Sequence, residues 1–343
     1  MARSSERPFH PPSDPRWQAL HVEAALEPGL EIVDAHHHLF ARPHWPYGLD
    51  DLLADFAAGH RIVASVYVQC GEHYLPGGPP QLRPVGETRF VDEAARRSLH
   101  ASEEAVHACA AIVGHADLTL GAAVEEVLEA HLQASPSRFR GIRHGLSTDP
   151  DPAYARSGPR PRPGLMADAA FREGFSRLAR HGLSFDAWLY HPQIPELVEL
   201  ARAYPDTRIV LDHVGGPLGL GGYAGRRDEV FTRWRNSIRA LASCPNVVVK
   251  LGGLGMRLTG FGFEEGETPP DSATLAAAWG PWIESCIEAF GVERAMFESN
   301  FPVDGCSCGY GVLWNAFKRI TAGASDEEKA ALYRRTACQF YRI

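Results

Sequence analysis

Hydrophobic and polar positions follow two alternating patterns along the chain. Eight short runs rich in apolar and β-branched residues are each followed by a longer segment in which apolar residues recur every three to four positions. The short runs predict strands at residues 31–36, 61–69, 108–116, 138–146, 183–191, 207–215, 246–253 and 293–300. The longer segments predict helices at residues 49–58, 87–99, 121–134, 166–182, 195–204, 226–243, 271–291 and 310–323, with a last helix at 326–340. This order is typical of a parallel sheet built from repeated strand–helix units.

The number of these units decides between two architectures. Eight strand–helix units close naturally into a (β/α)8 barrel of the TIM type. An open doubly wound sheet would carry a glycine-rich phosphate loop after its first strand, but histidines occupy that place here. We therefore predict an α/β protein with one barrel domain over residues 30–343, capped by the C-terminal helix. Residues 1–29 are polar and rich in proline, and we expect an N-terminal arm there, either wrapped on the surface or disordered.

Composition and charge exclude several classes of protein. The 343 residues carry a formal net charge of −8 and no dense basic cluster, which argues against nucleic-acid binding. No apolar run reaches the roughly 18 residues of a membrane span, so we expect no membrane partner. Seven scattered cysteines without a CxxC pair indicate a reducing cytoplasm rather than a disulfide framework. The partner that remains is a small-molecule substrate, and a homodimer is the default assembly.

Polar and ionisable side chains gather at the carboxyl ends of the predicted strands. In chain order they are His36, His37, His38, Gln69, Glu72, His115, Arg143, His144, Asp186, Trp188, Tyr190, His191, Asp212, His213, Lys250, Glu298, Asn300 and Asp304. In a barrel of this type the carboxyl ends of the strands form the active-site face. An unpaired buried polar group costs about 1–3 kcal/mol, so a packed core would not hold this many. We therefore expect these side chains to line a cavity.

The run EIVDAHHHLF, residues 31–40, carries the strongest chemical signal. Alternate side chains of a strand share a face, so His36 and His38 point into the barrel mouth while His37 points outward. Asp34 shares the inward face, one layer deeper. Two neutral imidazoles on a rigid strand are well placed to share one divalent cation, and Zn²⁺ is the first choice. A pair of hydrogen-bonded histidines without a metal is the alternative.

The motif D-x-H-x-H at the end of the first strand resembles the amidohydrolase superfamily. The later segments FDAWLYHPQIPEL, VLDHVGGPLG, NVVVKLGGLG and AMFESNFPVD resemble its lactonase branch, which includes L-fuconolactonase, 4-sulfomuconolactone hydrolase and 2-pyrone-4,6-dicarboxylate lactonase. The resemblance covers residues 31 to about 340. It names no substrate.

The resemblance implies a role for several of these residues. His36 and His38 would bind the metal, and His191 is the nearest match to a third ligand. His213 would orient the attacking water or polarise the substrate carbonyl. The family's eighth strand supplies an aspartate as general base, but Asn300 stands in that place here. An amide cannot take a proton from water, so we expect Asp304 to be the base, with Glu298 as a weaker candidate. The same substitution keeps a metal-free site open.

The reaction that these features predict is hydrolysis of a cyclic ester. The substrate would be a lactone of a small acidic or polyhydroxylated molecule, attacked by an activated water. Arg143 and Lys250 could clamp a substrate carboxylate, or each could pair with an interior acid such as Asp186 or Glu298. Gln69, Glu72, Trp188 and Tyr190 are further candidate substrate contacts. A metal-dependent decarboxylase, an amide hydrolase and a non-catalytic small-molecule-binding barrel are the alternatives.

Overall fold

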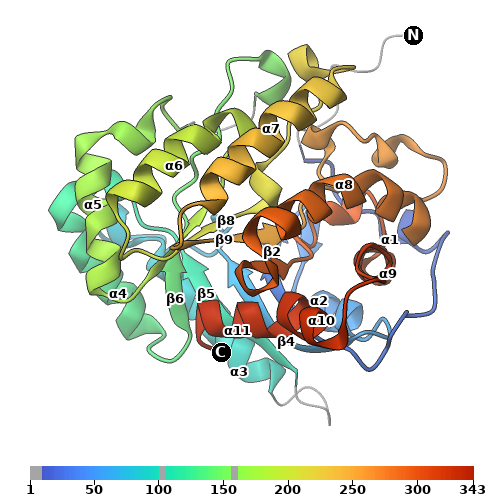
Figure 1. Cartoon of the computed structure of the whole chain (residues 1–343). Helices are drawn as coiled ribbons and strands as arrows, with labels where there is room; N and C mark the ends of the chain where they lie inside the picture. The colour runs from blue at the N-terminus through green and yellow to red at the C-terminus, as the bar shows by residue number, and fades with distance from the viewer. Residues whose placement is uncertain (1–9, 100–105, 156–160) are drawn as a thin grey trace.

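The protein forms a nearly closed barrel of parallel strands surrounded by helices, as the computed structural model shows (Figure 1). The structure describes residues 10–99, 106–155 and 161–343. The eight strands pair in the order β1-β4-β5-β6-β7-β8-β9-β10. Their bounds are β1 Glu31–His37, β4 Arg61–Val68, β5 His107–Gly114, β6 Phe139–Ile142, β7 Ser184–Ala187, β8 Ile209–Leu211, β9 Val247–Leu251 and β10 Ala295–Phe297. The predicted (β/α)8 barrel is confirmed.

The barrel closes where the chain leaves its first and last strands. The backbone N–H of Asn300 donates to the carbonyl oxygen of His36 at 2.8 Å, and the N–H of His38 donates to that of Phe301 at 2.8 Å. These two hydrogen bonds lie just beyond the end of β10. The closure therefore joins the histidine segment directly to the segment that follows the eighth strand.

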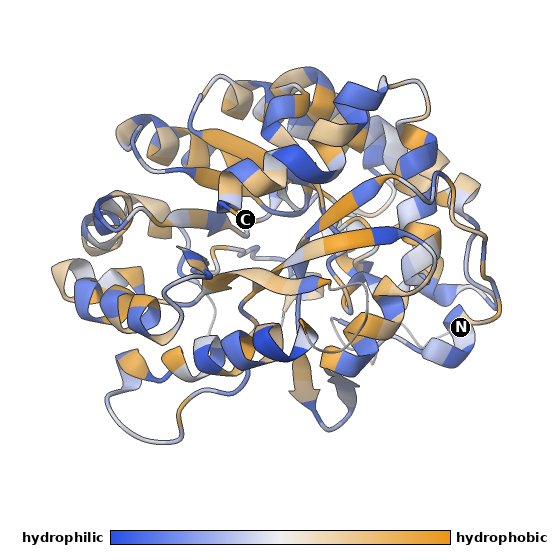
Figure 2. Ribbon diagram, turned by 90° about the horizontal axis from the view of Figure 1, so that it is seen from below, coloured by the Kyte–Doolittle hydropathy of each residue, from blue (hydrophilic) through white to orange (hydrophobic). Residues whose placement is uncertain are grey.

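Helices form the outer layer around the strands, and Figure 2 shows polar and apolar residues interspersed along them. Their bounds are α2 Leu49–Phe56, α3 Val85–Ser98, α4 Val124–Ala134, α5 Ala169–Arg180, α6 Ile194–Ala203, α7 Arg227–Ala242, α8 Ser272–Phe290, α9 Tyr310–Ile320, α10 Asp326–Ala330 and α11 Thr336–Tyr341. Each of these helices overlaps a segment in which the spacing of apolar residues predicted a helix. The last predicted helix is interrupted by a wider π-helical turn, Ala331–Arg335.

Small and branched residues fill the inside of the barrel. Val33, Ala35, Val66, Val113 and Val210 form part of one buried cluster, which also contains Ala337, Phe340 and Tyr341 of α11. Because α11 packs into this cluster, it closes the end of the barrel where the strands begin. The opposite end, where the strands finish, is left for the polar residues.

The structure differs from the predicted elements in three places. A short hairpin of β2, Phe40–Arg42, and β3, Trp45–Tyr47, follows the histidines and was not predicted. The strands β6, β7 and β8 end at Ile142, Ala187 and Leu211, each four residues before its predicted end. A single helical turn, α1 Pro15–Gln18, lies in the predicted arm, and residues 1–9 of that arm lie outside the described residues.

The described part of the arm is bonded to the barrel. The carboxylate of Glu23 accepts hydrogen bonds from the backbone N–H and the hydroxyl of Ser272 at 2.7 and 2.6 Å. The N–H of Leu26 donates to Asn315 Oδ1 at 2.8 Å. The arm thus runs along the starts of α8 and α9. Within the described ranges, no helix combines the length and the apolar composition that a membrane crossing requires.

Candidate active site

A cleft of about 620 Å³ opens at the carboxyl ends of the strands. Its floor is polar, with His38, Gln69, His115, Arg143, His213 and Asn300. Its walls are largely aromatic and apolar, with Phe40, Trp45, Tyr74, Trp188, Met256 and Val303. The segments after all eight strands therefore meet at one concave surface, as expected for the catalytic face of a barrel.

The two inward histidines of the first strand face each other across a short gap. The Nε2 atoms of His36 and His38 lie 3.3 Å apart, and both side chains are buried. His38 Nδ1 donates to the carbonyl oxygen of Val68 at 2.7 Å, which leaves its Nε2 as a lone pair. His37 lies on the other face of the strand, where Ser65 Oγ is 2.9 Å from its Nε2. Burial lowers the pKa of His36 and of His38 well below the usual value, so both rings are neutral.

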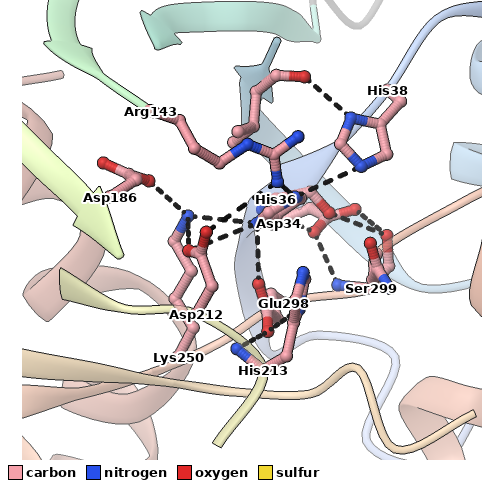
Figure 3. A network of polar contacts seen from close by, with 12 residues as sticks. Asp34, His36, His38, Arg143, Asp186, Asp212, His213, Lys250, Glu298 and Ser299 are labelled. Carbon is pink, nitrogen blue, oxygen red and sulfur yellow. Dashed lines mark hydrogen bonds and ion pairs between the residues drawn. The ribbon is translucent and has the colours of Figure 1, made fainter. Parts of the chain in front are cut away.

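Glu298 bridges two of the histidines (Figure 3). Its Oε1 accepts from Nδ1 of His213 at 2.7 Å and from the backbone N–H of the same residue at 3.0 Å. Its Oε2 lies 3.0 Å from Nδ1 of His36. A proton on Nδ1 of His213 leaves Nε2 of that ring as a lone pair. His213 lines the cleft, so this pair presents a base to a bound substrate.

Lys250 lies below the cleft floor, between the carboxylates of Asp186 and Asp212. Its Nζ is 2.8 Å from Asp186 Oδ2, 3.0 Å from Asp212 Oδ1 and 3.2 Å from Nδ1 of His36. Burial alone would lower the pKa of Lys250, but the carboxylates of Asp186, Asp212 and Glu298 raise it. The side chain is fully buried, so the predicted clamp between Lys250 and Arg143 is not formed. The alternative, a pair with the interior acid Asp186, is what the structure shows.

Arg143 reaches the cleft from the end of β6. Its guanidinium donates through Nη2 to the carbonyl oxygen of Gln69. Nη1 lies 3.4 Å from Nε2 of His36 and 3.8 Å from Asp212 Oδ2. The residue is 7% exposed and lines the cleft. It is therefore a strongly cationic group of the cleft floor that a substrate could contact directly.

Asn300 and Asp304 form a pair beside His213. Asn300 Nδ2 donates to Asp304 Oδ1 at 2.7 Å, and the N–H of Gly255 donates to Asp304 Oδ2 at 2.9 Å. A side chain at Gly255 would bring its Cβ within 2.9 Å of this carboxyl group. Burial raises the pKa of Asp304 to about 7. Both oxygens are engaged and the side chain does not line the cleft, whereas Asn300 does.

Residues 33–343 match the sequence model of a family described as amidohydrolase. The chain belongs to the amidohydrolase family.

Relatives of this amidohydrolase include sugar lactonases. An uncharacterized protein, y4mH, of Sinorhizobium fredii is 36% identical over 87% of this chain and 86% of its own length. The L-fucono-1,5-lactonase of Burkholderia multivorans is 28% identical over 92% of this chain and 97% of that enzyme. A crystal structure of an amidohydrolase from Burkholderia multivorans with bound zinc matches with a TM-score of 0.68 at 25% identity, over 91% of this chain and 99% of that one.

The donor groups of this amidohydrolase fit a divalent cation. Two nitrogen ligands of one tetrahedral zinc ion stand about 3.3 Å apart, the separation that the two Nε2 atoms show. Ligating histidines usually donate their other ring N–H to a carboxylate or carbonyl, and here Glu298 and Val68 face those Nδ1 atoms. One ligand atom each from His36, His213 and Glu298 also lies within 4.8 Å of the other two.

The charge of the buried cluster also favours a cation. The carboxylates of Asp186, Asp212 and Glu298 stand against two cations, Lys250 and Arg143. Asp186 Oδ1 and Asp212 Oδ2 are buried and accept no hydrogen bond from the described residues, whereas Asp212 Oδ1 lies 3.0 Å from Lys250 Nζ and Glu298 Oε2 lies 3.0 Å from Nδ1 of His36. An excess of buried negative charge and of unused acceptors is stabilised by an added positive ion.

Two of the residues assigned from sequence lie away from this centre. His191 accepts from the N–H of Leu218 at 3.2 Å and packs against Tyr223, outside the histidine group. The strand that should have carried it ends at Ala187, so the alternation of a strand does not extend to position 191. Asp34 accepts from the hydroxyl groups of Ser299 at 2.6 Å and Tyr310 at 3.1 Å, and so anchors the barrel closure rather than the cleft.

Two predicted substrate contacts also lie outside the cleft lining. Tyr190 is 1% exposed and belongs to an apolar cluster with Tyr154 and Trp188. Glu72 pairs with Arg42 at 2.7 Å. Gln69 and Trp188 do line the cleft.

His115 is a cleft residue to which the sequence analysis gave no role. Its Nδ1 donates to the carbonyl oxygen of Arg143 at 3.1 Å, so its Nε2 is an acceptor. The hairpin residues Phe40 and Trp45 were missed as well. The turn residues Arg42, Pro43 and His44 between aromatic positions were the signal that could have revealed this hairpin.

Proposed function

We propose that this amidohydrolase hydrolyses a lactone of a small acidic or polyhydroxylated molecule. The observation that carries the proposal is the His213–Glu298 pair, with its ring at the floor of the cleft and its Nδ1–Oε1 distance of 2.7 Å. The L-fucono-1,5-lactonase of Burkholderia multivorans and the L-rhamnono-gamma-lactonase of Scheffersomyces stipitis support the choice of a cyclic ester.

In this proposal His213 takes the proton from the attacking water. Glu298 holds the ring through Nδ1 and stabilises the imidazolium that forms, as a carboxylate does behind a general-base histidine. This assignment replaces Asp304 as the proposed base, because the oxygens of Asp304 face Asn300 and Gly255. Asp304 and Asn300 instead hold the loop beside the ring.

Arg143 is the proposed partner of the substrate's oxygen atoms. Its guanidinium stands within the cleft floor and offers charge-assisted hydrogen bonds to a carboxylate or to the developing oxyanion. Gln69 and His115 lie beside it and provide neutral hydrogen-bonding groups for hydroxyl substituents. Trp188, at the wall, provides a flat apolar surface for the ring.

We propose one divalent cation, with Zn²⁺ as first choice, at Nε2 of His36 and His38. When bound, such a cation polarises a carbonyl oxygen and lowers the pKa of water from 15.7 toward about 7. The Arg143 Nη1 atom lies 3.4 Å from Nε2 of His36, so this guanidinium has to turn toward the cleft when the cation binds. With His191 elsewhere, the proposed protein ligands at this point are two rather than three.

Acid release from a panel of ring compounds tests the proposed reaction. The panel contains L-fucono-1,5-lactone, L-rhamnono-γ-lactone, an aromatic lactone, a cyclic amide and an aromatic carboxylate. We expect turnover of at least one lactone, with loss of that turnover in His213→Asn. Release of CO₂ from the carboxylate or cleavage of the amide alone would favour the decarboxylase or amide hydrolase alternative. Binding without turnover of any compound would favour a non-catalytic barrel.

We further propose a cytoplasmic homodimer that acts on this small molecule without nucleic acid or membrane partners. The seven cysteines support a reducing compartment, because all are free and five are buried. Light scattering of the purified chain tests the dimer, and a monomer at micromolar concentration would reject it.

A further inference from the structure

The C-terminal helix reaches the centre of the barrel through one hydroxyl group. Tyr341, the last residue of α11, is fully buried, and its hydroxyl donates to Asp186 Oδ2 at 2.7 Å. The same carboxylate oxygen lies 2.8 Å from Lys250 Nζ. The centre of the Tyr341 ring is 5.4 Å from this ammonium group. A residue at the closed end of the barrel thus contacts both members of a buried ion pair.

Lys250 is held by two carboxylates, through Asp186 Oδ2 at 2.8 Å and Asp212 Oδ1 at 3.0 Å. Nδ1 of His36 lies 3.2 Å from the same ammonium group. Asp186 Oδ1 has no hydrogen-bond partner among the described residues. Without the Tyr341 hydroxyl, therefore, nothing but Lys250 itself would fix the orientation of the Asp186 carboxylate.

The position of Lys250 matters because two groups compete for Nδ1 of His36. Glu298 Oε2, at 3.0 Å, accepts a proton from this nitrogen, which leaves Nε2 as a lone pair that can bind a cation. Lys250 Nζ, at 3.2 Å, donates to it, which places the ring proton on Nε2 and blocks that lone pair. A position of Lys250 close to Asp186 and Asp212 therefore favours the tautomer in which Nδ1 of His36 carries the proton and Nε2 is free to bind a cation.

We propose that Tyr341 is a positioning residue of the active site, which orients Asp186 so that this carboxylate holds Lys250 away from His36. The inference rests on the proposed cation at His36 and His38. It makes α11 part of the catalytic apparatus as well as a cap. Carboxylates and other groups behind metal-binding histidines typically change metal affinity by about 10–100-fold when they are removed.

Tyr341→Phe tests the proposal by removing one oxygen atom and keeping the buried ring. We expect zinc affinity, measured by competition with a chromogenic chelator, to fall about tenfold. We expect kcat to fall by a similar factor while KM changes less than about twofold, because the substrate contacts are untouched. Wild-type zinc affinity and wild-type kcat in this variant would overturn the proposal.

Tyr333→Phe is the matched control. Tyr333 is also fully buried, and its hydroxyl contacts Thr321 Oγ1 at 2.9 Å rather than an acid of the site. The control removes the same group from the same part of the chain, and we expect wild-type zinc affinity and kcat. An equal loss in both variants would mean a structural role for Tyr341 and would reject the positioning role.

A double-mutant cycle with Asp186→Asn separates a direct effect from one that passes through Asp186. If Tyr341 acts through Asp186, Tyr341→Phe adds little to the zinc affinity lost in Asp186→Asn. Fully additive losses would overturn the proposal. Should Tyr341→Phe be insoluble, Asp186→Asn alone decides, since wild-type zinc affinity in that variant would equally reject it.

The two proposals can fail separately. Zinc affinity does not depend on the identity of the substrate, so the Tyr341 effect is measurable even if no lactone is hydrolysed. A protein that turns over lactones with wild-type zinc affinity in Tyr341→Phe would keep the proposed function and lose the inference about Tyr341.

Discussion

Glu298 holds His213 by its ring and by its backbone at the same time. One carboxylate oxygen, Oε1, accepts from Nδ1 at 2.7 Å and from the backbone N–H at 3.0 Å. His213 has a φ of 56°, in the left-handed region that few side chains other than Asn, Asp and His adopt. The double contact stabilises this conformation and fixes which ring nitrogen faces the cleft. The chemistry of His213 therefore depends on a residue from a strand two places away.

His213→Asn should reduce kcat by about 10²–10⁴-fold, the usual contribution of a general base. Glu298→Gln should cost less than His213→Asn, because the amide oxygen can still accept from Nδ1 but carries no charge to stabilise the imidazolium. Steady-state kinetics on the best lactone of the panel check both values. Full activity in His213→Asn would exclude this ring as the base.

Asp304→Asn distinguishes the base assigned from sequence from the one assigned from structure. If Asp304 were the base, as expected from the sequence, this variant would lose several orders of magnitude in kcat. The buried geometry of Asp304 instead predicts a loss of about tenfold or less, the cost of one weakened hydrogen bond. A loss as large as that in His213→Asn would restore Asp304 as the base.

The ionisation of Asp304 should also affect stability. Its pKa is raised by burial to about 7 in the folded protein, above the ordinary value of 3.8, so the folded state holds a proton that the unfolded state has released. The stability that this proton contributes is lost as the pH rises from about 4 to about 7. Asp304→Asn lacks this loss, so its unfolding free energy relative to wild type should increase between pH 5 and pH 8 in urea titrations. A constant difference would contradict the assignment.

Buried histidines should make the protein sensitive to acid. Burial lowers the pKa of His37 to about 3 and those of His60, His131, His144 and His191 to about 4. Each ring stays neutral in the folded state while the unfolded state takes up a proton below about 6.5. Burial also lowers the pKa of His36, His38 and His115, so eight of the described histidines act in this direction. They outnumber the six described acids with raised pKa, which act in the opposite direction: Asp34, Asp55, Glu87, Asp186, Glu196 and Asp304. The unfolding free energy should therefore fall as the pH decreases from about 6.5 to about 4, and an unchanged midpoint of urea unfolding would contradict this.

Elemental analysis of three variants tests the metal ligands. His36→Asn and His38→Asn should lose bound zinc, whereas His191→Asn should retain it, because His191 lies outside the histidine group. Asn is a matched replacement at position 191, since its Oδ1 can accept from the N–H of Leu218 as Nδ1 does. Zinc loss in His191→Asn would support the third ligand that the family resemblance implied. Metal-free wild-type protein with full activity would reject the cation altogether.

Arg143→Lys and Arg143→Gln should both raise KM for an anionic substrate, with the larger effect in Gln. Arg143→Lys keeps the positive charge but loses the paired N–H donors of the guanidinium, so we expect KM to rise about tenfold. Arg143→Gln also loses the charge, so we expect a larger rise in KM. A neutral lactone of similar size is the control, because its KM should change less. Equal KM values for all three proteins would exclude contact between Arg143 and the substrate.

The strand–helix alternation was sufficient to predict the barrel, and the i, i+2 spacing was sufficient to predict the facing pair His36 and His38. Both depend on local periodicity, which the sequence displays directly. The alternation of side chains along β1 wrongly placed Asp34 on the face of these histidines, because the register of β1 is irregular between Asp34 and His37. The positions of His191 and Lys250 could not be predicted in the same way. The position of His191 depends on where β7 ends. The position of Lys250 depends on Asp186 and Asp212, which neighbouring strands place at the same depth in the barrel as its ammonium group. The alternation of side chains along a strand predicts which face a residue occupies, but it does not predict how far that residue lies from the open end of the barrel.

The segment before the first strand has a practical consequence for work with this protein. Trp17 Nε1 donates to the carbonyl oxygen of Gly266 at 3.1 Å, and Gln18 Nε2 donates to that of Gly305 at 2.5 Å. Gly305 follows Asp304 directly, so the polar extension supports the turn that shapes one side of the catalytic floor. A shortened clone that starts at residue 30 would remove these supports together with the hydrogen bonds of Glu23. Low activity in such a clone would reflect a loosened turn and would say nothing about the chemistry of the histidines.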